Sequence, residues 1–190
     1  MDLNTIFFIG PQGSGKGTQA KLLEKRLGFF HWDMGAILRE VAAGPTELGQ
    51  KVKEQIDSGI LLGDDLLLEV AKAKLKTIEP SMGVVFDGIP RRLWQAEFLM
   101  DFLKEQGRRH FATVFLNLPK EESLKRLLLR GQVQGRADDT REKIEFRLQQ
   151  YFEDTLPVLE YLKPLSNFFE IDGRPAVDKV TASINKALGL

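Results

Sequence analysis

Short apolar runs alternate with amphipathic segments along the whole chain. The runs are rich in Phe, Val and Ile, and turn residues bound them. Such runs are typical of strands that are buried on both faces of a parallel sheet. Four clear runs and a weaker fifth, FFHW, predict strands at 5–9, 83–88, 111–118, 167–172 and, for FFHW, 29–32.

The segments between these runs carry apolar residues at helical spacing, as Ala20, Leu23 and Leu27 do within 16–27. The same pattern predicts further helices at 63–76, 92–106, 119–130, 140–162 and 175–188. Alternating strands and helices are typical of a doubly wound α/β fold with right-handed crossovers. We therefore predict a parallel five-stranded sheet covered by helices.

One segment departs from the alternation. From 33 to about 77 the pattern predicts successive helices and no strand, with boundaries at Gly44-Pro45 and Gly63. We expect a helical insertion at one edge of the sheet. Insertions at the carboxyl ends of parallel strands often cover a ligand site.

Composition narrows the function classes. The 190 residues suit one domain, and 27 Lys and Arg balance 27 Asp and Glu. This neutral balance disfavours nucleic acid and acidic membranes as partners. The absence of cysteine excludes disulfides and thiolate catalysis. With no signal-like or membrane-spanning apolar stretch, we expect a cytoplasmic protein.

The strand predicted at 5–9 leads into GPQGSGKGTQ, residues 10–19, and a helix follows. The pattern Gly10-x-x-x-x-Gly15-Lys16 in this context predicts a phosphate-binding loop. Glycines let backbone N–H groups turn inward, and together with the helix N-terminus these amides form an anion cradle. Lys16 then adds a point charge. The alternative, a plain glycine-rich turn, explains neither the lysine nor the context.

The loop departs from the general motif because Gly17 and Thr18 follow the lysine, where Ser or Thr is usual at the first of these positions. In this it closely resembles the loop of the adenylate kinases and their nucleoside monophosphate kinase relatives. Further segments resemble motifs of the same family, in the same order along the chain. They are HWDMGAILRE (31–40), SGILLGDDL (58–66), FDGIPRRLWQ (86–95), RLLLRGQVQGRADDT (126–140), FRLQQYFEDTLPVLEYL (146–162) and IDGRPAVDKV (171–180).

The resemblance implies one nucleoside monophosphate kinase domain over 1–190, with an acceptor-binding insertion at about 33–62 and a short lid at about 131–139. It implies Mg²⁺-dependent transfer of a phosphoryl group from ATP to AMP. By resemblance, ATP is bound by Gly13, Ser14, Gly15, Lys16, Gly17, Thr18, Arg126, Arg130 and Arg174. AMP is bound by Met34, Arg39, Leu62, Gly88, Arg91, Gln95, Arg136 and Arg147. The catalytic residues are Lys16, Asp87, Arg91, Arg130, Arg136 and Arg147.

These residue types suit the chemistry, since phosphoryl transfer needs positioning and charge neutralisation and arginine grips phosphate oxygens with two donors. The resemblance further implies that Arg126 stacks on the ATP adenine, which the 171–180 loop touches. Asp87 would hold Mg²⁺ through bound water. It also implies that Gln95 bonds the acceptor base, for which an amide is suited because it both donates and accepts.

Other charged residues lack such a context. We interpret Arg92, Arg108, Arg109 and Arg141 as surface residues, and His31 and His110 as non-catalytic. Asp138 and Asp139 are suited to orient neighbouring arginines by ion pairing, to cap the helix that starts near Thr140, or to do both.

Two departures from the family leave alternatives open. Relatives usually have Ser-Thr-Gly-Asp where this chain has Asp33-Met34-Gly35-Ala36. Asp33 is still a suitable helix cap, but Met34 replaces a threonine that contacts the acceptor adenine in adenylate kinases. The lid segment is short, so a zinc site in an inserted lid domain is excluded. We therefore expect an adenylate kinase that acts as a monomer, and keep as alternatives a UMP/CMP or broad-specificity nucleoside monophosphate kinase and a nucleotide-binding protein without turnover.

Overall fold

The computed structural model describes residues 3–57, 63–134 and 139–190. Its strands are β1 (Thr5–Ile9), β2 (Phe30–Asp33), β3 (Val84–Asp87), β4 (Phe111–Asn117) and β5 (Asn167–Asp172). Its helices are α1 (Lys16–Leu27), α2 (Met34–Ala43), α3 (Glu47–Asp57), α4 (Asp64–Leu75), α5 (Leu93–Glu105), α6 (Lys120–Gln134), α7 (Arg141–Gln150), α8 (Leu156–Leu162) and α9 (Val177–Leu188). A π-helical turn, η1 (Tyr151–Thr155), joins α7 to α8, and a 3₁₀ turn, η2 (Lys163–Leu165), follows α8.

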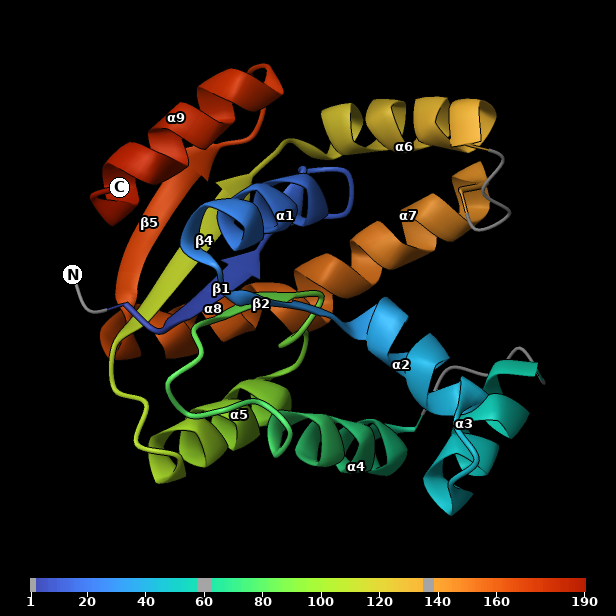
Figure 1. Ribbon diagram of the computed structural model, residues 1–190. Helices are drawn as coiled ribbons and strands as arrows, with labels where there is room; N and C mark the ends of the chain where they lie inside the picture. The colour runs from blue at the N-terminus through green and yellow to red at the C-terminus, as the bar shows by residue number, and fades with distance from the viewer. Residues whose placement is uncertain (1–2, 58–62, 135–138) are drawn as a thin grey trace.

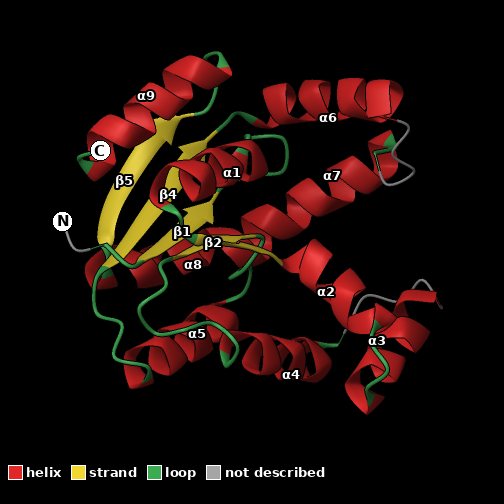
Figure 2. Cartoon of the chain, in the orientation of Figure 1, coloured by secondary structure: helices red, strands yellow, loops and turns green. Residues whose placement is uncertain are grey.

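The five strands form one sheet in the order β2-β3-β1-β4-β5, and every neighbouring pair is parallel. Helices cover both faces, with α1 and α9 on one side and α5 and α8 on the other (Figures 1 and 2). The doubly wound α/β prediction is therefore confirmed, including the weak strand at FFHW, which the structure places one residue later. Because β1 is the central strand, the loop that follows it lies in the middle of the carboxyl end of the sheet.

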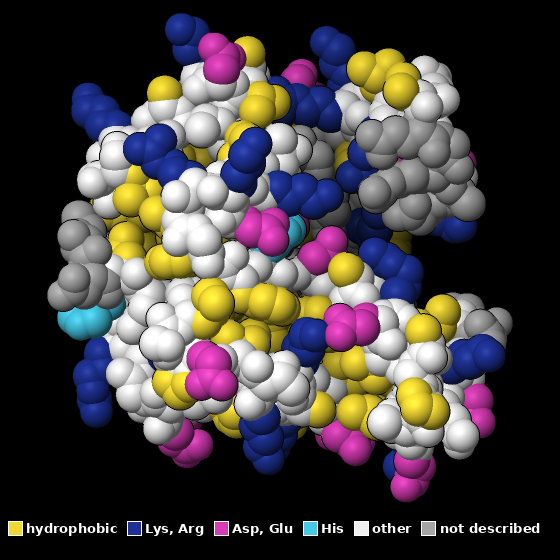
Figure 3. Space-filling model, viewed as in Figure 1, with side chains coloured by type: hydrophobic (Ala, Val, Ile, Leu, Met, Phe, Trp, Pro, Cys, Tyr) yellow, Lys and Arg dark blue, Asp and Glu magenta, His cyan; other side chains and the backbone are white. Residues whose placement is uncertain are grey.

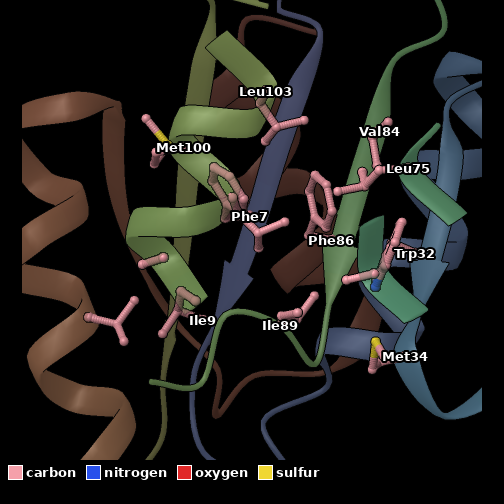
Figure 4. Packing of buried hydrophobic residues seen from close by; sticks show 14 of the residues in the cluster. Phe7, Ile9, Trp32, Met34, Leu75, Val84, Phe86, Ile89, Met100 and Leu103 are labelled. Atoms are coloured by element: carbon pink, nitrogen blue, oxygen red, sulfur yellow. The ribbon is translucent and has the colours of Figure 1, made fainter. Parts of the chain in front are cut away.

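The alternation of side chains along β1 explains why its run of apolar residues is unbroken. Phe7 and Ile9 pack into the cluster beneath α5 and α8, with Trp32 and Phe86 (Figure 4). Ile6 and Phe8 point to the opposite face, against α1 and α9. A strand buried on both faces reads as a nearly continuous apolar run and not as an alternation of apolar and polar residues.

Along the chain, helices α2, α3 and α4 come between β2 and β3, as predicted for the segment without strands. Figure 1 shows α2 and α3 projecting beyond the sheet, on the side where β2 ends. Within the predicted lid, α6 continues to Gln134, and residues 135–138 lie outside the described part of the chain.

The interpretation of Arg108 as a surface residue is wrong. Its side chain is 1% exposed and donates from Nη1 to the carbonyl of Asn4 at 3.2 Å and from Nη2 to that of Glu79 at 3.1 Å. Burial lowers the pKa of this guanidinium. The side chain is tolerated inside because two of its nitrogens donate to carbonyls from distant parts of the chain. Arg92, Arg109 and Arg141 are exposed, as predicted.

The single helix predicted at 140–162 is interrupted. The π-helical turn η1 separates α7 from α8, and its residues Tyr151 and Thr155 are buried. Turns of this kind are rare and are frequently found at functional sites. Here the turn faces the glycine-rich loop, as described below.

Candidate active site

The loop between β1 and α1 has the backbone that a phosphate cradle needs. Gly10, Gly13 and Gly15 all have positive φ angles, of 154°, 83° and 95°. A side chain at Gly10 would place its Cβ 2.5 Å from the carbonyl oxygen of Leu116, so the loop packs closely on β4. Gly15 is the N-cap of α1 and supplies no side-chain cap, so the amides of the first turn remain available to an anion.

Lys16 begins α1 and folds back over this loop. Its Nζ donates to the carbonyl of Gly10 at 2.7 Å and to that of Pro11 at 2.8 Å. Burial lowers the pKa of Lys16 to about 8, and the charges of Arg91 and Arg130 act in the same direction while Asp87 opposes them. The four charged groups therefore lie within electrostatic range of one another, at the end of the sheet where the loop opens. An anionic ligand would favour the charged lysine.

Asp87 ends β3 beside the loop. A Cβ added at Gly17 would lie 3.0 Å from Asp87 Oδ2, so the carboxylate lies close against this glycine. Burial raises the pKa of Asp87, and Lys16 is the largest opposing charge. His31 Nε2 lies 4.0 Å from Oδ2, a proximity that the sequence did not reveal.

Among the described residues, no three acidic or histidine side chains are grouped to hold a metal ion. Mg²⁺ keeps several waters and is usually bound through one or two carboxylates together with substrate phosphates. Asp87, with its carboxylate against the start of α1, is the residue placed to take part.

The turn after β3 carries the predicted acceptor residues Gly88 and Arg91, and the first turn of α5 carries Gln95. Arg91 donates from Nε to the carbonyl of Gly88 at 2.8 Å, and Thr155 Oγ1 in η1 donates to the Arg91 carbonyl at 2.9 Å. Arg91, Lys16 and Gly88 line one pocket together with Tyr151 and Thr155 of the π-helical turn. The π-helical turn thus packs against the turn that carries Arg91, a contact that sequence reasoning missed.

Gln95 is buried, and its amide has one defined orientation. Its Oε1 accepts the backbone N–H of Arg91 at 2.7 Å. A backbone N–H needs an acceptor, so the oxygen must face it and Nε2 must be the donor that faces the other way. One side chain therefore links the backbone of Arg91 to a directed donor.

The end of β2 carries the segment that departs from relatives. Asp33 Oδ1 accepts the backbone N–H of Ala36 at 3.0 Å, so the prediction that Asp33 caps α2 is confirmed. Met34 is 7% exposed and packs in the core cluster next to Gly88. Arg39 is exposed, and its guanidinium lies over Gly35.

Asp139 joins two of the predicted catalytic arginines. Its fully buried carboxylate accepts from Arg130 Nε at 2.7 Å and Nη2 at 2.9 Å, and from Arg147 Nη2 at 2.7 Å. The hydrogen bonds from Arg130 are the main cause that lowers the pKa of Asp139. The predicted pairing role is confirmed for Asp139, but Thr140 caps α7, through a 3.4 Å bond from the Lys143 N–H to its Oγ1.

Arg126 and Arg174 lie on the other side of the phosphate loop, next to the loop that follows β5. Arg126 donates from Nε to Glu122 Oε1 at 2.8 Å, from Nη1 to the carbonyl of Gly173 at 2.9 Å and from Nη2 to that of Arg174 at 2.8 Å. The guanidinium of Arg174 pairs with Asp172 and lowers its pKa to about 2. Arg126 is therefore a fixed planar group laid on the loop after β5.

The structure thus brings most predicted residues to the carboxyl end of the sheet. Lys and Arg side chains line a hollow that opens between the α6–α7 region and the α2–α3 region (Figure 3). Thr18 and Arg39 are exposed, Leu62 and Arg136 fall outside the described residues, and Asp138 does as well. Sequence reasoning gave no role to Gln19, which is buried and bonded to α9.

A glycine-rich loop between a central parallel strand and a helix, with its lysine facing arginines, defines a phosphate-loop protein that handles nucleotide phosphates. Comparison with known proteins narrows this class. The family model described as adenylate kinase matches residues 8–167. The chain belongs to the adenylate kinase family, and it is accordingly a phosphotransferase.

Individual relatives agree over almost the whole length. The chain is 40% identical over 185 residues to the adenylate kinase of Thermus thermophilus, covering 97% of both chains. It is 39% identical over 186 residues to that of Phocaeicola vulgatus, covering 98% of both, and 37% identical over 184 residues to that of Stenotrophomonas maltophilia, covering 96% of this chain and 98% of the relative. None of the helices in the described part of the chain is long and apolar enough to cross a membrane.

Proposed function

We propose that this chain catalyses the reversible, Mg²⁺-dependent transfer of the terminal phosphoryl group of ATP to AMP, giving two ADP. The observation that carries the proposal is that Lys16 of the phosphate loop and Arg91 of the acceptor turn line the same pocket. A donor phosphate on the loop and an acceptor phosphate on Arg91 would face each other across it. Such juxtaposition is the main requirement of phosphoryl transfer.

In the forward reaction an oxygen of the AMP phosphate attacks the γ-phosphorus of ATP, and the bond to the β–γ bridging oxygen breaks. ADP leaves from the donor side, and the acceptor becomes ADP. The amides of Gly13, Ser14, Gly15, Gly17 and Thr18, with Lys16, hold the donor phosphates in this proposal. Arg130 and Arg147, oriented by Asp139, neutralise charge on the transferred group, and we assign the same role to Arg136.

Mg²⁺ supplies charge neutralisation at the donor phosphates when it is bound, and Asp87 is the residue that we propose holds it, through water. Its raised pKa would fall on binding a cation, because a nearby positive charge favours the carboxylate. Gly17 leaves the space that this carboxylate occupies.

Gln95 supports adenine as the acceptor base. Its Nε2 is the directed donor, so it suits a base whose ring nitrogen accepts a hydrogen bond, as adenine N1 and cytosine N3 do. Uracil and guanine present an N–H at the corresponding ring position and would face donor against donor. We therefore propose AMP as the best acceptor, CMP as a weaker one, and UMP and GMP as poor ones.

The remaining contacts to the acceptor come from both sides of the β2 and β3 ends. Arg39 and Arg91 hold the acceptor phosphate, and Met34, Leu62 and Gly88 surround the nucleoside. Met34 adds soft packing and no hydrogen-bond pattern, so it does not choose between bases. Asp33 is engaged as a helix cap, which leaves base choice mainly to Gln95.

We also propose that the insertion at about 33–62 and the lid at about 131–139 close over the bound nucleotides. Closure would exclude water, which otherwise accepts the phosphoryl group. A bisubstrate analogue that joins two adenosines through phosphates should make the protein more compact in small-angle scattering. An unchanged radius of gyration would contradict closure but not the chemistry.

The reaction itself is tested by incubating the protein with ATP, AMP and Mg²⁺ and measuring ATP, AMP and ADP. We predict that two ADP form for each AMP consumed. We also propose that the enzyme is cytoplasmic and works as a monomer on free nucleotides. ATP binding without ADP formation would instead indicate a regulatory protein that has lost turnover. Release of inorganic phosphate without AMP consumption would also overturn the proposal.

A further inference from the structure

Gln19 is a buried polar side chain on α1 that lies outside the phosphate pocket. It is 3% exposed and makes two hydrogen bonds, both to α9. Its Nε2 donates to the carbonyl of Val177 at 3.1 Å, and its Oε1 accepts from Thr181 Oγ1 at 2.9 Å. Because a carbonyl only accepts, the amide orientation is fixed. Gln19 therefore ties two helices together with both ends of one side chain.

Each of the two tied helices begins at a loop. Gln19 lies in the first turn of α1, where its N–H donates to the carbonyl of Gly15 in the phosphate loop at 3.0 Å. Val177 is the first residue of α9 and directly follows residues 173–176, the loop after β5. The side chain of Gln19 thus spans from the base of the phosphate loop to the exit of the β5 loop.

The β5 loop also packs directly on the phosphate loop. Gly173 N–H donates to the carbonyl of Asn117 at 2.8 Å, and a Cβ at Gly173 would lie 3.4 Å from the carbonyl oxygen of Ser14. Arg126 holds the carbonyls of Gly173 and Arg174 from the other side. The two loops therefore form one unit, and Gln19 is a buried polar side chain that joins their helices.

The sheet order indicates what this unit binds. The acceptor residues follow β2 and β3, which lie on one side of β1, whereas β4 and β5 lie on the other. Ligands of such sheets bind at the carboxyl ends of the strands. A donor whose phosphates occupy the loop after β1 has the β4–β5 side left for its nucleoside. There it would meet the β5 loop and the flat guanidinium of Arg126, a group that stacks on aromatic rings.

We propose that Gln19 is a positioning residue for the donor nucleoside. It holds the β5 loop at a fixed distance from the phosphate loop, so that base and phosphates are bound at the same time. The proposal rests on the proposed function, which assigns ATP to this side of the sheet, and deepens it. Gln19 itself touches neither phosphate nor base.

The test compares two ligands by calorimetry, with Mg²⁺ present and AMP absent. ATP probes both loops, whereas inorganic tripolyphosphate probes the phosphate loop alone. Gln19→Leu removes both hydrogen bonds and preserves most of the volume. The Val177 carbonyl also lies 2.8 Å from Thr181 Oγ1, so in the variant the single hydroxyl hydrogen of Thr181 can be donated there and both groups stay paired. We expect the Kd for ATP to rise roughly threefold to tenfold, the scale of one or two hydrogen bonds, and that for tripolyphosphate to stay unchanged.

Matched variants separate positioning from general loss of structure. Thr181→Val should reproduce part of the effect, and Thr181→Ser, which keeps the hydroxyl, should restore wild-type ATP binding. Ser183→Ala removes a hydroxyl that donates only to the Lys179 carbonyl of its own helix, at 3.0 Å, and should change neither ligand. In turnover, Gln19→Leu should raise the KM for ATP and leave the KM for AMP within about a factor of two, well below the effect of a lost hydrogen bond.

Two results would overturn the proposal. If Gln19→Leu weakens ATP and tripolyphosphate equally, Gln19 acts on the phosphate loop and not on the nucleoside. If ATP binding is unchanged while the unfolding temperature falls, Gln19 only packs α1 against α9. Direct binding needs no phosphoryl transfer, so a wild type that binds ATP but leaves AMP unphosphorylated would refute the proposed function without deciding this experiment.

Discussion

Replacing Asp139 with asparagine should weaken both stability and turnover, because one buried carboxylate holds two arginines. The carboxylate accepts three hydrogen bonds of 2.7–2.9 Å from Arg130 and Arg147. Asparagine keeps one acceptor oxygen and turns the other into an NH₂ group that faces an arginine N–H. The variant therefore loses the negative charge and at least one hydrogen bond, with little change in volume.

The size of the stability loss depends on how exposed the side chains of Arg130 and Arg147 are. A hydrogen bond to a charged group contributes about 1.5–3 kcal/mol. The Arg130 and Arg147 side chains are 30% and 25% exposed, so water would partly solvate them once released. We therefore expect a loss near the lower end, about 1.5–2 kcal/mol. For a chain of this size that is a fall in Tm of roughly 3–8 °C.

The pH dependence of folding stability is a second, independent test of the contribution of Asp139. The folded-state pKa of Asp139 lies below its ordinary value of 3.8. Its stabilisation is thus fully present above that value and is lost as the pH falls through the folded-state pKa. Urea unfolding should show a constant difference between wild type and Asp139→Asn from pH 7 to about 5, which shrinks below about pH 4. Turnover at pH 7 should fall about tenfold or more as the arginines lose their orientation.

The matched control is Glu145→Gln, which removes an exposed partner of Arg141 and should cost less than about 1 kcal/mol. An Asp139→Asn variant as stable as the wild type at pH 7 would refute the reasoning. So would a stability difference that grows as the pH is lowered.

Three further substitutions test other parts of the account. Lys16→Met should lower kcat by at least about a hundredfold and leave the circular dichroism spectrum unchanged, and near-normal activity would remove the phosphate-loop assignment. Arg108→Leu removes two hydrogen bonds from a charged donor to the carbonyls of Asn4 and Glu79, each of which keeps a backbone N–H donor, and should lower the free energy of urea unfolding by about 1–3 kcal/mol with kcat unchanged; equal stability would show that burying the guanidinium costs as much as its two hydrogen bonds contribute. Met34→Thr should sharpen the preference for AMP over CMP by up to about tenfold, and an unchanged ratio of initial rates would show that position 34 does not contact the base.

The fold could be predicted because strand and helix patterns here agree with their surroundings. The run at 6–9 is apolar at every position since β1 is the central strand and is covered on both faces. The phosphate loop was identifiable because glycines and a lysine at this fixed spacing, between a strand and a helix, are rare outside phosphate-binding loops. The predicted cap at Asp33 depended on a local contact, three residues along the chain, and such contacts are visible in sequence.

The features that escaped prediction depend on contacts distant in sequence. Arg108 lies 104 residues from Asn4, and Gln19 lies 158 residues from Val177, so neither partner could be inferred from spacing. The π-helical turn at 151–155 leaves the helical period of the sequence almost unchanged, and its role becomes visible only when Thr155 meets the carbonyl of Arg91. Polar residues at buried positions have no signature of their own in a single sequence.

The central claim, that the site transfers phosphate from ATP to AMP, is tested most directly by initial rates with ATP and equal concentrations of AMP, CMP, UMP and GMP. We predict the fastest ADP formation with AMP, a lower rate with CMP, and little turnover with UMP or GMP, because the Gln95 amide presents a donor to the base. A higher rate with CMP or UMP than with AMP would contradict this prediction and assign the chain to the pyrimidine nucleoside monophosphate kinases.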